Sequence, residues 1–167
     1  KGFCPAFYQG YLNLVPDDGN LRIHLEDIMS DTVELVNERD PEKLTWAYEK
    51  GKWTIKDILV HLSDTERVFI YRALRFSRGD ETPLPGFEEK TFAANAGADQ
   101  REIADIIREL SLVRESSIAF IESLNDEAIE RKGTANGNPL SVLLLVIVIE
   151  VHHKHHLNII HERYLKE

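Results

Sequence analysis

Five of the seven histidines in this chain lie within one short segment, from His152 to His161. Imidazole is the commonest side-chain ligand of divalent transition metals, and it binds them in its neutral form. Because residues four apart share one face of a helix, His152 and His156 could place their rings against the same ion. The zinc helix H-E-x-x-H has a related spacing, but here His153 stands where its glutamate would act as general base.

Helical phase indicates which of these histidines point inward. The stripe that contains His152 and His156 is apolar on both sides of the pair, whereas the stripe through His155 turns polar toward its end. We therefore predict that His152 and His156 face the interior, that His153 and His155 flank a helix interface, and that His161 lies near the exposed side. The members of the inward stripe are Leu145, Ile149, His152, His156, Ile159 and Ile160.

A third metal ligand has to come from another helix. His61 lies beside the apolar stripe of a helix predicted over 54–78, so we expect it to be half-buried, with Asp64 one turn on as a ligand or a partner of one. His24, on a helix predicted over 21–38, is the other candidate. The alternative to a metal site is a hydrogen-bonded polar core or a group of surface histidines. Protonating neighbouring buried imidazoles is costly, and a divalent ion avoids that cost by binding them neutral, which favours the metal.

Four amphipathic helices are expected to position these residues. Thr54 followed by Asp57 is typical of a helix capping box, and Asp99 followed by Glu102 repeats that pattern. The connection of about twenty residues between Gly79 and Asp99 is long for a compact domain, so it could cover a functional site. The helices are predicted over residues 21–38, 54–78, 99–124 and 139–164.

The start of the last helix has two possible interpretations. Gly133 to Gly137 breaks the chain, and Asn138 is a good N-cap with Pro139 at the first helical position. The β-branched residues of Val142–Ile149 would also suit a buried strand, but the segment continues without a break into the helical histidine stripe. We therefore predict a helix there, and an all-α four-helix bundle that forms a single domain over residues 1–167.

Composition limits the classes of partner. The formal net charge is −9, which argues against nucleic acid, since phosphate binding needs a basic face. The single Cys4 has no disulfide partner in the chain, which suits a reducing cytoplasm. The longest apolar run, Val142–Ile149, has eight residues, far short of the roughly 20 that span a bilayer. We expect a cytoplasmic protein with no secretion signal and no membrane partner.

Two segments resemble the DinB-like (YfiT/BstA) superfamily. Residues Trp53–Glu66, with the sequence WTIKDILVHLSDTE, are similar to its second helix, and His152–Tyr164 are similar to its C-terminal helix. The opening segment Phe7–Pro16 is similar as well. The resemblance implies a four-helix bundle in up-down-down-up order. It also implies a homodimer and a divalent metal, nickel or zinc, bound by three histidines; these map onto His61, His152 and His156.

The resemblance also implies a choice of activities. Members include S-transferases that use low-molecular-weight thiols, a mycothiol-dependent maleylpyruvate isomerase and metal-dependent hydrolases. We expect an S-transferase that uses a small thiol, with a hydrolase or a non-catalytic metal-binding bundle as alternatives. A hydrolase would need a base, for which Asp64 and Glu150 are candidates. Cys4 is not expected to be a nucleophile. Aromatic residues that could line a pocket are Tyr8, Tyr11, Trp46, Trp53 and Phe87.

Overall fold

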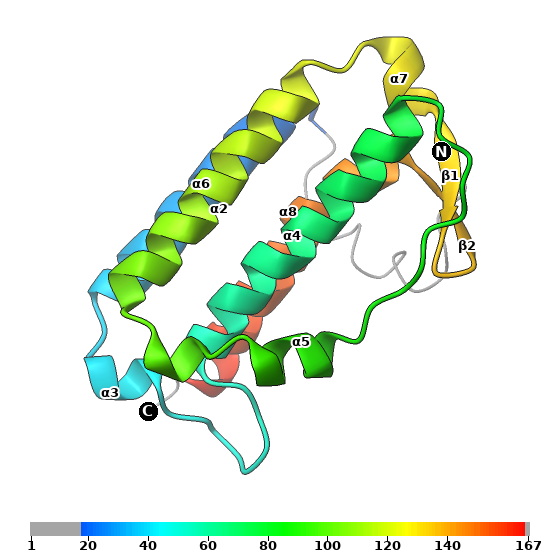
Figure 1. The fold of residues 1–167 in the computed structure, drawn as a ribbon. Coiled ribbons are helices and arrows are strands. Elements are labelled where there is room, and N and C mark those ends of the chain that lie inside the picture. The colour runs from blue at the N-terminus through cyan, green and yellow to red at the C-terminus, as the bar shows by residue number, and fades with distance from the viewer. Residues whose placement is uncertain (1–17, 166–167) are drawn as a thin grey trace.

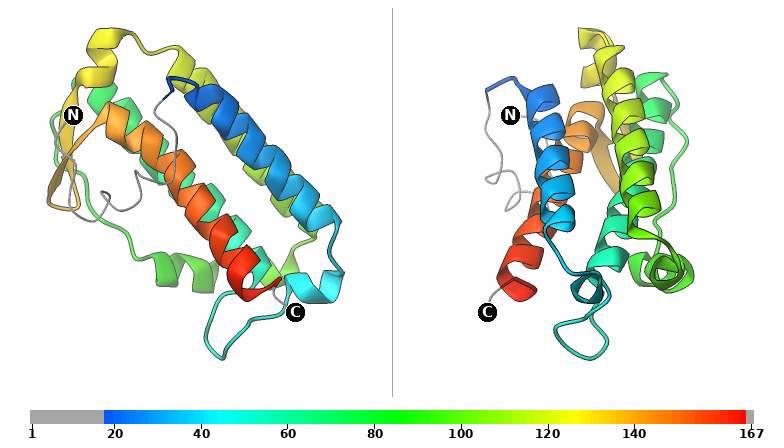
Figure 2. Two further views of the ribbon diagram at one scale, coloured as in Figure 1. Left: turned by 180° about the vertical axis from the view of Figure 1, so that it is seen from behind. Right: turned by 90° about the vertical axis from the view of Figure 1, so that its left-hand side faces the viewer.

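Four long helices dominate the computed structural model, which describes residues 18–165 (Figure 1). Helices α2 and α8 run in one direction and α4 and α6 run in the other, as both views of Figure 2 show. This order is the up-down-down-up four-helix bundle predicted from the sequence. The four helices are α2 (Leu21–Asn37), α4 (Ile55–Ser77), α6 (Ile103–Glu122) and α8 (Val142–Arg163).

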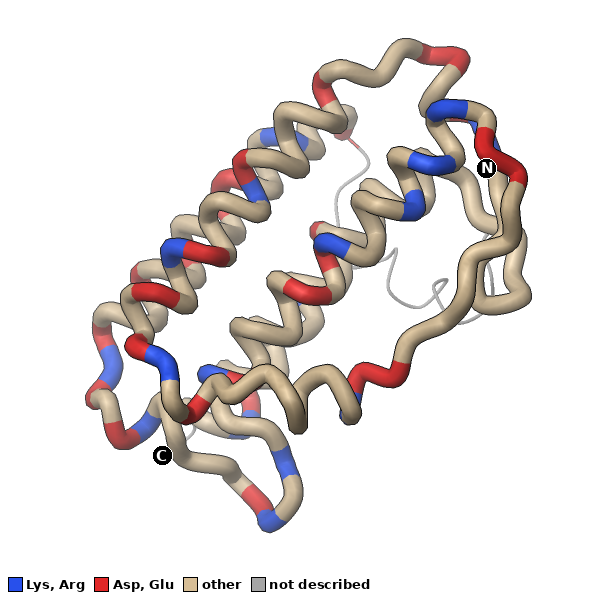
Figure 3. Tube along the Cα trace, in the orientation of Figure 1, with Lys and Arg blue, Asp and Glu red and all other residues tan. Residues whose placement is uncertain are grey.

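Parallel neighbours explain the long connection between α4 and α6. Since these helices pack side by side in the same direction, the chain has to return along the length of the bundle before α6 can begin (Figure 1). The return carries α5 (Glu89–Asn95) and the 3₁₀ turn η2 (Ala98–Gln100). Figure 3 shows basic residues along the second half of α4. The Arg72 side chain of this helix donates a hydrogen bond to the Pro85 carbonyl of the connection at 2.9 Å. The length of this connection is therefore a requirement of the topology.

Helix α4 begins where the sequence predicts. The Thr54 hydroxyl accepts a hydrogen bond from the Asp57 backbone N–H at 3.1 Å, and the Asp57 carboxylate accepts one from the Thr54 N–H at 2.9 Å. This capping box satisfies two backbone donors and stabilises a helix start by about 1 kcal/mol. It anchors the helix two turns before His61, so that His61 lies in regular helix.

The predicted start of the last helix is wrong. Asn138–Ser141 is strand β2, which pairs antiparallel with β1 (Lys132–Ala135), and α8 begins only at Val142 with Ser141 as its N-cap. The turn between the strands is Asn136-Gly137, with φ of 51° and 72°. Asn-Gly is the dipeptide that best adopts the left-handed conformation required at both positions of a two-residue hairpin turn. That local preference, with the ladder it allows, outweighs the N-cap signal of Asn138.

The predicted capping box at Asp99 is also wrong. Residues 98–100 form η2, and α6 begins at Ile103 after Glu102, whose side chain makes no capping hydrogen bond. Gly97 precedes this turn with φ of 61°, a left-handed conformation that glycine adopts without strain. Helix α5, the hairpin and the short helices α3 (Pro41–Leu44) and α7 (Asp126–Glu130) were not among the predicted elements.

The interior of the bundle has two apolar clusters with a polar layer between them. One cluster surrounds Leu59, Ile106 and Ile160, and the other surrounds Phe76 and Val146. Helix α8 is long and apolar enough by composition to span a membrane, but twelve of its residues are buried in this bundle, as expected of a core helix. The buried polar residues of the layer on α2, α4, α6 and α8 include Thr32, His61, Thr65, Glu66, Arg114, His153 and His156.

Candidate metal centre

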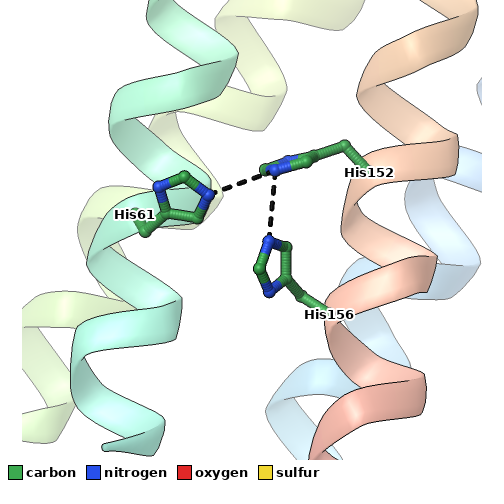
Figure 4. Close-up of side chains that lie close together, drawn as sticks. All are labelled: His61, His152 and His156. Carbon is green, nitrogen blue, oxygen red and sulfur yellow. Dashed lines mark hydrogen bonds between the residues drawn. The ribbon is translucent and has the colours of Figure 1, made fainter. Parts of the chain in front are cut away.

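Three histidines, one from α4 and two from α8, converge on one another (Figure 4). The Nε2 atom of His152 lies 3.1 Å from Nε2 of His61 and 3.2 Å from Nε2 of His156. One ring nitrogen from each residue lies within 4.8 Å of the other two. The structure therefore brings together the three residues to which the resemblance assigned a metal. The alternative ligand, His24, lies elsewhere, between Asp18 and Glu150.

The spacing of these nitrogens suits one shared ion. Imidazole nitrogens bind zinc at about 2.0–2.1 Å, so two ligands of the same ion lie roughly 2.9 Å apart at a right angle and roughly 3.4 Å apart at the tetrahedral angle. The separations of 3.1 Å and 3.2 Å from His152 Nε2 fall within this range. Three protein ligands of this kind are typical of catalytic rather than structural sites, because they leave a coordination position open.

Burial keeps the three rings neutral. Removal from water lowers the pKa of His61 to about 4 and that of His156 to about 3, where the neighbouring imidazoles add a smaller effect. The pKa of His152 is lowered well below its usual value for the same reasons. At neutral pH the rings therefore carry no charge, and their lone pairs are available. A proton on His152 Nε2 can satisfy only one of its two contacts, whereas one cation can satisfy all three nitrogens.

The far nitrogens of the rings differ in their partners. His61 Nδ1 lies 3.3 Å from the Thr65 hydroxyl. If Nε2 presents its lone pair to the centre, Nδ1 carries the proton and donates it to this hydroxyl, which fixes both tautomer and ring orientation. His156 Nδ1 is buried and has no hydrogen-bond partner among the described residues. The orientation of His156 therefore depends on ring packing.

Aromatic rings enclose the histidines. The ring centroid of Trp53 lies 4.7 Å from that of His61 and 6.3 Å from that of His156, on which it stacks. Phe69 approaches His152 edge-on, with the ring centroids 6.0 Å apart. The hydroxyl of Tyr164, at the end of α8, donates a hydrogen bond to the Trp53 carbonyl and so ties Trp53 to the helix that carries two of the histidines. The site thus has apolar walls on more than one side.

The predicted pocket aromatics have different outcomes. Trp53 contacts the histidines, whereas Trp46 packs against Tyr164, and Phe87 packs against Phe92. Tyr8 and Tyr11 lie outside the described residues, as does Cys4. Phe69 was not predicted as part of the site, although it lies eight residues after His61 and therefore near the same face of α4.

Neither candidate base contacts the three histidines in the described structure. The Asp64 carboxylate is half-buried and lies 3.5 Å from the Arg67 guanidinium, and burial raises its pKa. Glu150 is buried 3.3 Å from His24 Nδ1, and burial likewise raises its pKa. Both carboxylates are engaged with basic side chains, and neither belongs to the cluster of potential ligands.

The prediction that only two histidines of the cluster face the interior is wrong. His153 is 1% exposed, which makes it more buried than His152 or His156, and it contacts Arg114 and Thr32. Burial and the charge of Arg114 lower its pKa. His155 is half-buried with its ring against His156, and His161 is exposed as predicted. His61 is 3% exposed, so it is buried rather than half-buried.

Comparison with known proteins places the chain in a family. The model of the DinB superfamily matches residues 24–160, and the chain therefore belongs to this superfamily. An Oceanobacillus iheyensis protein named "Putative metal-dependent hydrolase" is 25% identical over 126 residues, which cover 74% of this chain and 72% of that protein. The fold is similar to that of YfiT from Bacillus subtilis, with a TM-score of 0.74 and 17% identity over 92% of this chain and 91% of that one. YfiT is described as "a probable metal-dependent hydrolase with an unusual four-helix bundle topology".

Proposed function

We propose that this protein is a metal-dependent enzyme in which His61, His152 and His156 bind one divalent ion, nickel or zinc. The observation that carries the proposal is the convergence of three neutral imidazoles, two of them buried and one half-buried, whose nitrogen separations suit one ion. The name of the Oceanobacillus iheyensis relative supports a dependence on metal. Small-molecule substrates and a cytoplasmic location are part of the proposal.

The residues around the site suit the activation of a nucleophile, a water molecule or a thiol, by a bound divalent ion. A divalent ion bound there would act as a Lewis acid that lowers the pKa of a water or thiol. The three imidazoles contribute no negative charge, and their burial keeps protons from competing for their lone pairs. Trp53 and Phe69 limit the access of water to the rings, which strengthens electrostatic interactions in the site.

A low-molecular-weight thiol is the nucleophile that we favour, which makes the enzyme an S-transferase. A free thiol has a pKa of about 8.5, against 15.7 or so for bulk water, so it needs much less help to ionise. No carboxylate of the described residues contacts the three rings, and the two candidate bases, Asp64 and Glu150, are engaged with Arg67 and His24. A thiol substrate makes smaller demands on such a base than a water molecule does.

Hydrolysis is the second candidate, because the curated relative is named for it. A hydrolase would transfer a proton from water to a base, and Asp64, whose pKa is raised by burial, is the residue of α4 that could move toward this role. Substituting Asp64 separates the two activities. Asp64→Asn should abolish hydrolysis by this route and leave thiol transfer within about twofold.

The proposal is tested by activity at known metal content. The purified protein is stripped with a chelator, reloaded with nickel or zinc, and assayed with a panel of small thiols and an aromatic electrophile. In parallel, it is assayed with ester and amide substrates. We expect thiol transfer that is lost on stripping and restored on reloading. Turnover that persists at undetectable metal would refute the metal mechanism, and turnover of esters or amides alone would favour the hydrolase.

A further inference from the structure

One arginine in the polar layer connects all four helices of the bundle. Arg114 of α6 is 2% exposed, and its Nη2 lies 2.8 Å from the Glu66 carboxylate of α4. Its Nη1 donates to the Leu25 carbonyl of α2 at 2.9 Å, and Nη2 also donates to Nδ1 of His153 on α8 at 2.9 Å. A single guanidinium thus has a partner on each of the other three long helices.

The contacts of His153 determine where its proton lies. A guanidinium can only donate, so Nδ1 of His153 accepts, and the neutral ring must carry its proton on Nε2. Nε2 lies 2.8 Å from the Thr32 hydroxyl of α2. This hydroxyl donates its own hydrogen bond to the Ile28 carbonyl at 2.6 Å, so it accepts the one from Nε2. Both nitrogens of His153 are therefore occupied by buried partners, which explains why this histidine of the cluster cannot join the metal centre.

The same contacts fix the rotation of α8. Successive residues of an α-helix point about 100° apart, so a helix that holds His153 toward α2 and α6 must turn His152 toward a different neighbour. That neighbour is α4, where His61 lies. On α4, Glu66 directly follows Thr65, the hydrogen-bond partner of His61. The network therefore orients both helices of the metal centre within about a turn of the ligands.

We infer that His153 and Arg114 are positioning residues, which set the rotation of α8 and thereby aim His152 and His156 at His61. Apolar side chains can pack in several rotations of a helix, because dispersion and the hydrophobic effect have little directionality. Hydrogen bonds to a guanidinium and a hydroxyl select one rotation. As far as metal affinity is concerned, this inference rests on the proposed function.

The test compares two substitutions on α8 that both remove buried contacts. His153→Leu keeps the size of the side chain but removes its directional contacts, and Val146→Ala, two turns earlier and fully buried, removes only apolar packing. Affinity for zinc is measured by competition with a chromophoric chelator. We expect His153→Leu to bind zinc roughly tenfold or more weakly, as found when groups that orient ligands are removed, and Val146→Ala to bind as the wild type does.

A third variant guards against a simple loss of folding. His153→Gln retains an acceptor and a donor, so we expect it to recover at least half of the lost affinity on a logarithmic scale. Unfolding by urea is followed in all variants without metal. Equal zinc affinity in His153→Leu and Val146→Ala would overturn the positioning role. An affinity that follows the urea midpoint across all three variants, with no recovery in His153→Gln, would overturn it as well.

A measurement without metal separates this inference from the proposed function. In metal-free protein labelled with ¹⁵N, the histidine ring spectrum should show His153 as the Nε2–H tautomer. His153→Leu should shift the ring signals of His61, His152 and His156 more than Val146→Ala does. A wild type that binds no metal would refute the proposed function but leave this comparison intact. An Nδ1–H tautomer of His153, or unshifted ring signals, would refute the positioning role.

Discussion

His152 and His153 are neighbours in the chain but occupy opposite chemical environments. Nε2 of His152 faces the nitrogens of two other imidazoles, and none of these contacts has an assigned proton. Both contacts of His153 have an assigned donor: Arg114 donates to Nδ1, and Nε2 donates to the Thr32 hydroxyl. We call the environment of His152 open, because it can accept a ligand, and that of His153 closed, because both of its ring nitrogens already have partners. The difference arises from one step of helical rotation, which presents His152 to α4 and His153 to α2 and α6.

The two environments also differ in charge. The candidate metal centre consists of neutral rings whose ionisation is suppressed by burial. The network around His153 contains a buried ion pair, Arg114–Glu66, in which both side chains are less than 5% exposed. Such a pair is costly to break, because the remaining charge stays buried without a partner. Substitutions in the metal centre should therefore change metal binding, and substitutions in the network should change stability as well.

The largest expected effect is the loss of metal from the open environment. His152→Ala removes the central ligand, whose nitrogen contacts both others. We expect metal content to fall from about one ion per chain to less than about 0.1, because the two imidazoles that remain bind an ion far more weakly than three do. Elemental analysis after gel filtration measures it. His161→Ala, on the exposed side of α8, is the control and should keep its metal. Full occupancy in His152→Ala would mean that the ligands are assigned wrongly.

The next effect is on stability in the closed environment. Arg114→Leu leaves the Glu66 carboxylate, the Leu25 carbonyl and His153 Nδ1 without their donor. We expect a loss of about 3–5 kcal/mol in the free energy of unfolding, the usual cost of removing one partner of a buried ion pair. Urea denaturation of the metal-free protein measures it.

The double variant Glu66→Leu/Arg114→Leu is the control for this effect. It removes both charges together, so it should be more stable than Arg114→Leu alone. If Arg114→Leu loses less than about 1 kcal/mol, or if the double variant is the less stable of the two, the ion pair is not the energetic centre of the network.

The free energy of unfolding should depend on pH through His61 and His156, two of the rings that burial keeps neutral. In the unfolded chain a histidine has a pKa near 6.5, whereas in the folded protein that of His61 is about 4 and that of His156 about 3. Above pH 6.5 or so, neither state binds these protons and their contribution to stability is complete. As the pH falls below this value, the unfolded state takes up protons that the folded state refuses, so stability decreases down to about pH 3–4.

Each of these histidines contributes at most roughly 1.4 kcal/mol per pH unit within this window. Urea midpoints of the metal-free protein between pH 7 and pH 4.5 measure the slope. His61→Gln should have a shallower slope than the wild type, because it removes one of the groups whose pKa is lowered in the folded protein. Parallel curves for wild type and His61→Gln would show that the pKa of His61 is not lowered in the folded protein.

The sequence was a good guide to features that repeat along a helix. The four-residue spacing of His152 and His156, the stripe around them and the capping box at Thr54 all follow from local periodicity and are present in the structure. The environment of His153 depends on Arg114, 39 residues away in the chain and on another helix. No local pattern links those two residues. The helical phase of α8 was therefore the only guide to His153, and it predicted a position beside a helix interface rather than in the interior.

The errors at helix starts have a similar origin. Asn138 and Pro139 satisfy the local rules for beginning a helix, but the Asn136-Gly137 turn pairs this segment with β1 before α8 can begin. Parallel packing of α4 and α6 accounts for the length of the connection before α6, and a cover over the site by this connection stays a prediction. At the start of α8, the pairing of two neighbouring strands decided between two structures that the local sequence allows.

The smallest effects come from two threonines that play matching roles in the two environments. The Thr65 hydroxyl contacts Nδ1 of His61 at 3.3 Å, and the Thr32 hydroxyl accepts from Nε2 of His153 at 2.8 Å. Valine has the shape of threonine without the hydroxyl. Thr32→Val leaves a buried N–H without an acceptor, so we expect a loss of about 1–3 kcal/mol in the free energy of unfolding. In Thr65→Val the contact that is lost is longer, and the loss should stay below about 1 kcal/mol.

For metal binding, the order of the two variants should be reversed. Thr65→Val frees the ring of a direct ligand and should weaken zinc binding by about tenfold. Thr32→Val acts only through His153 and the rotation of α8, and it should weaken zinc binding by less than Thr65→Val does. Urea denaturation and chelator competition on the same two proteins give both rankings. If the same variant has both the lower free energy of unfolding and the lower zinc affinity, the two environments are not energetically separate. Each hydroxyl would then support the whole polar layer rather than one histidine.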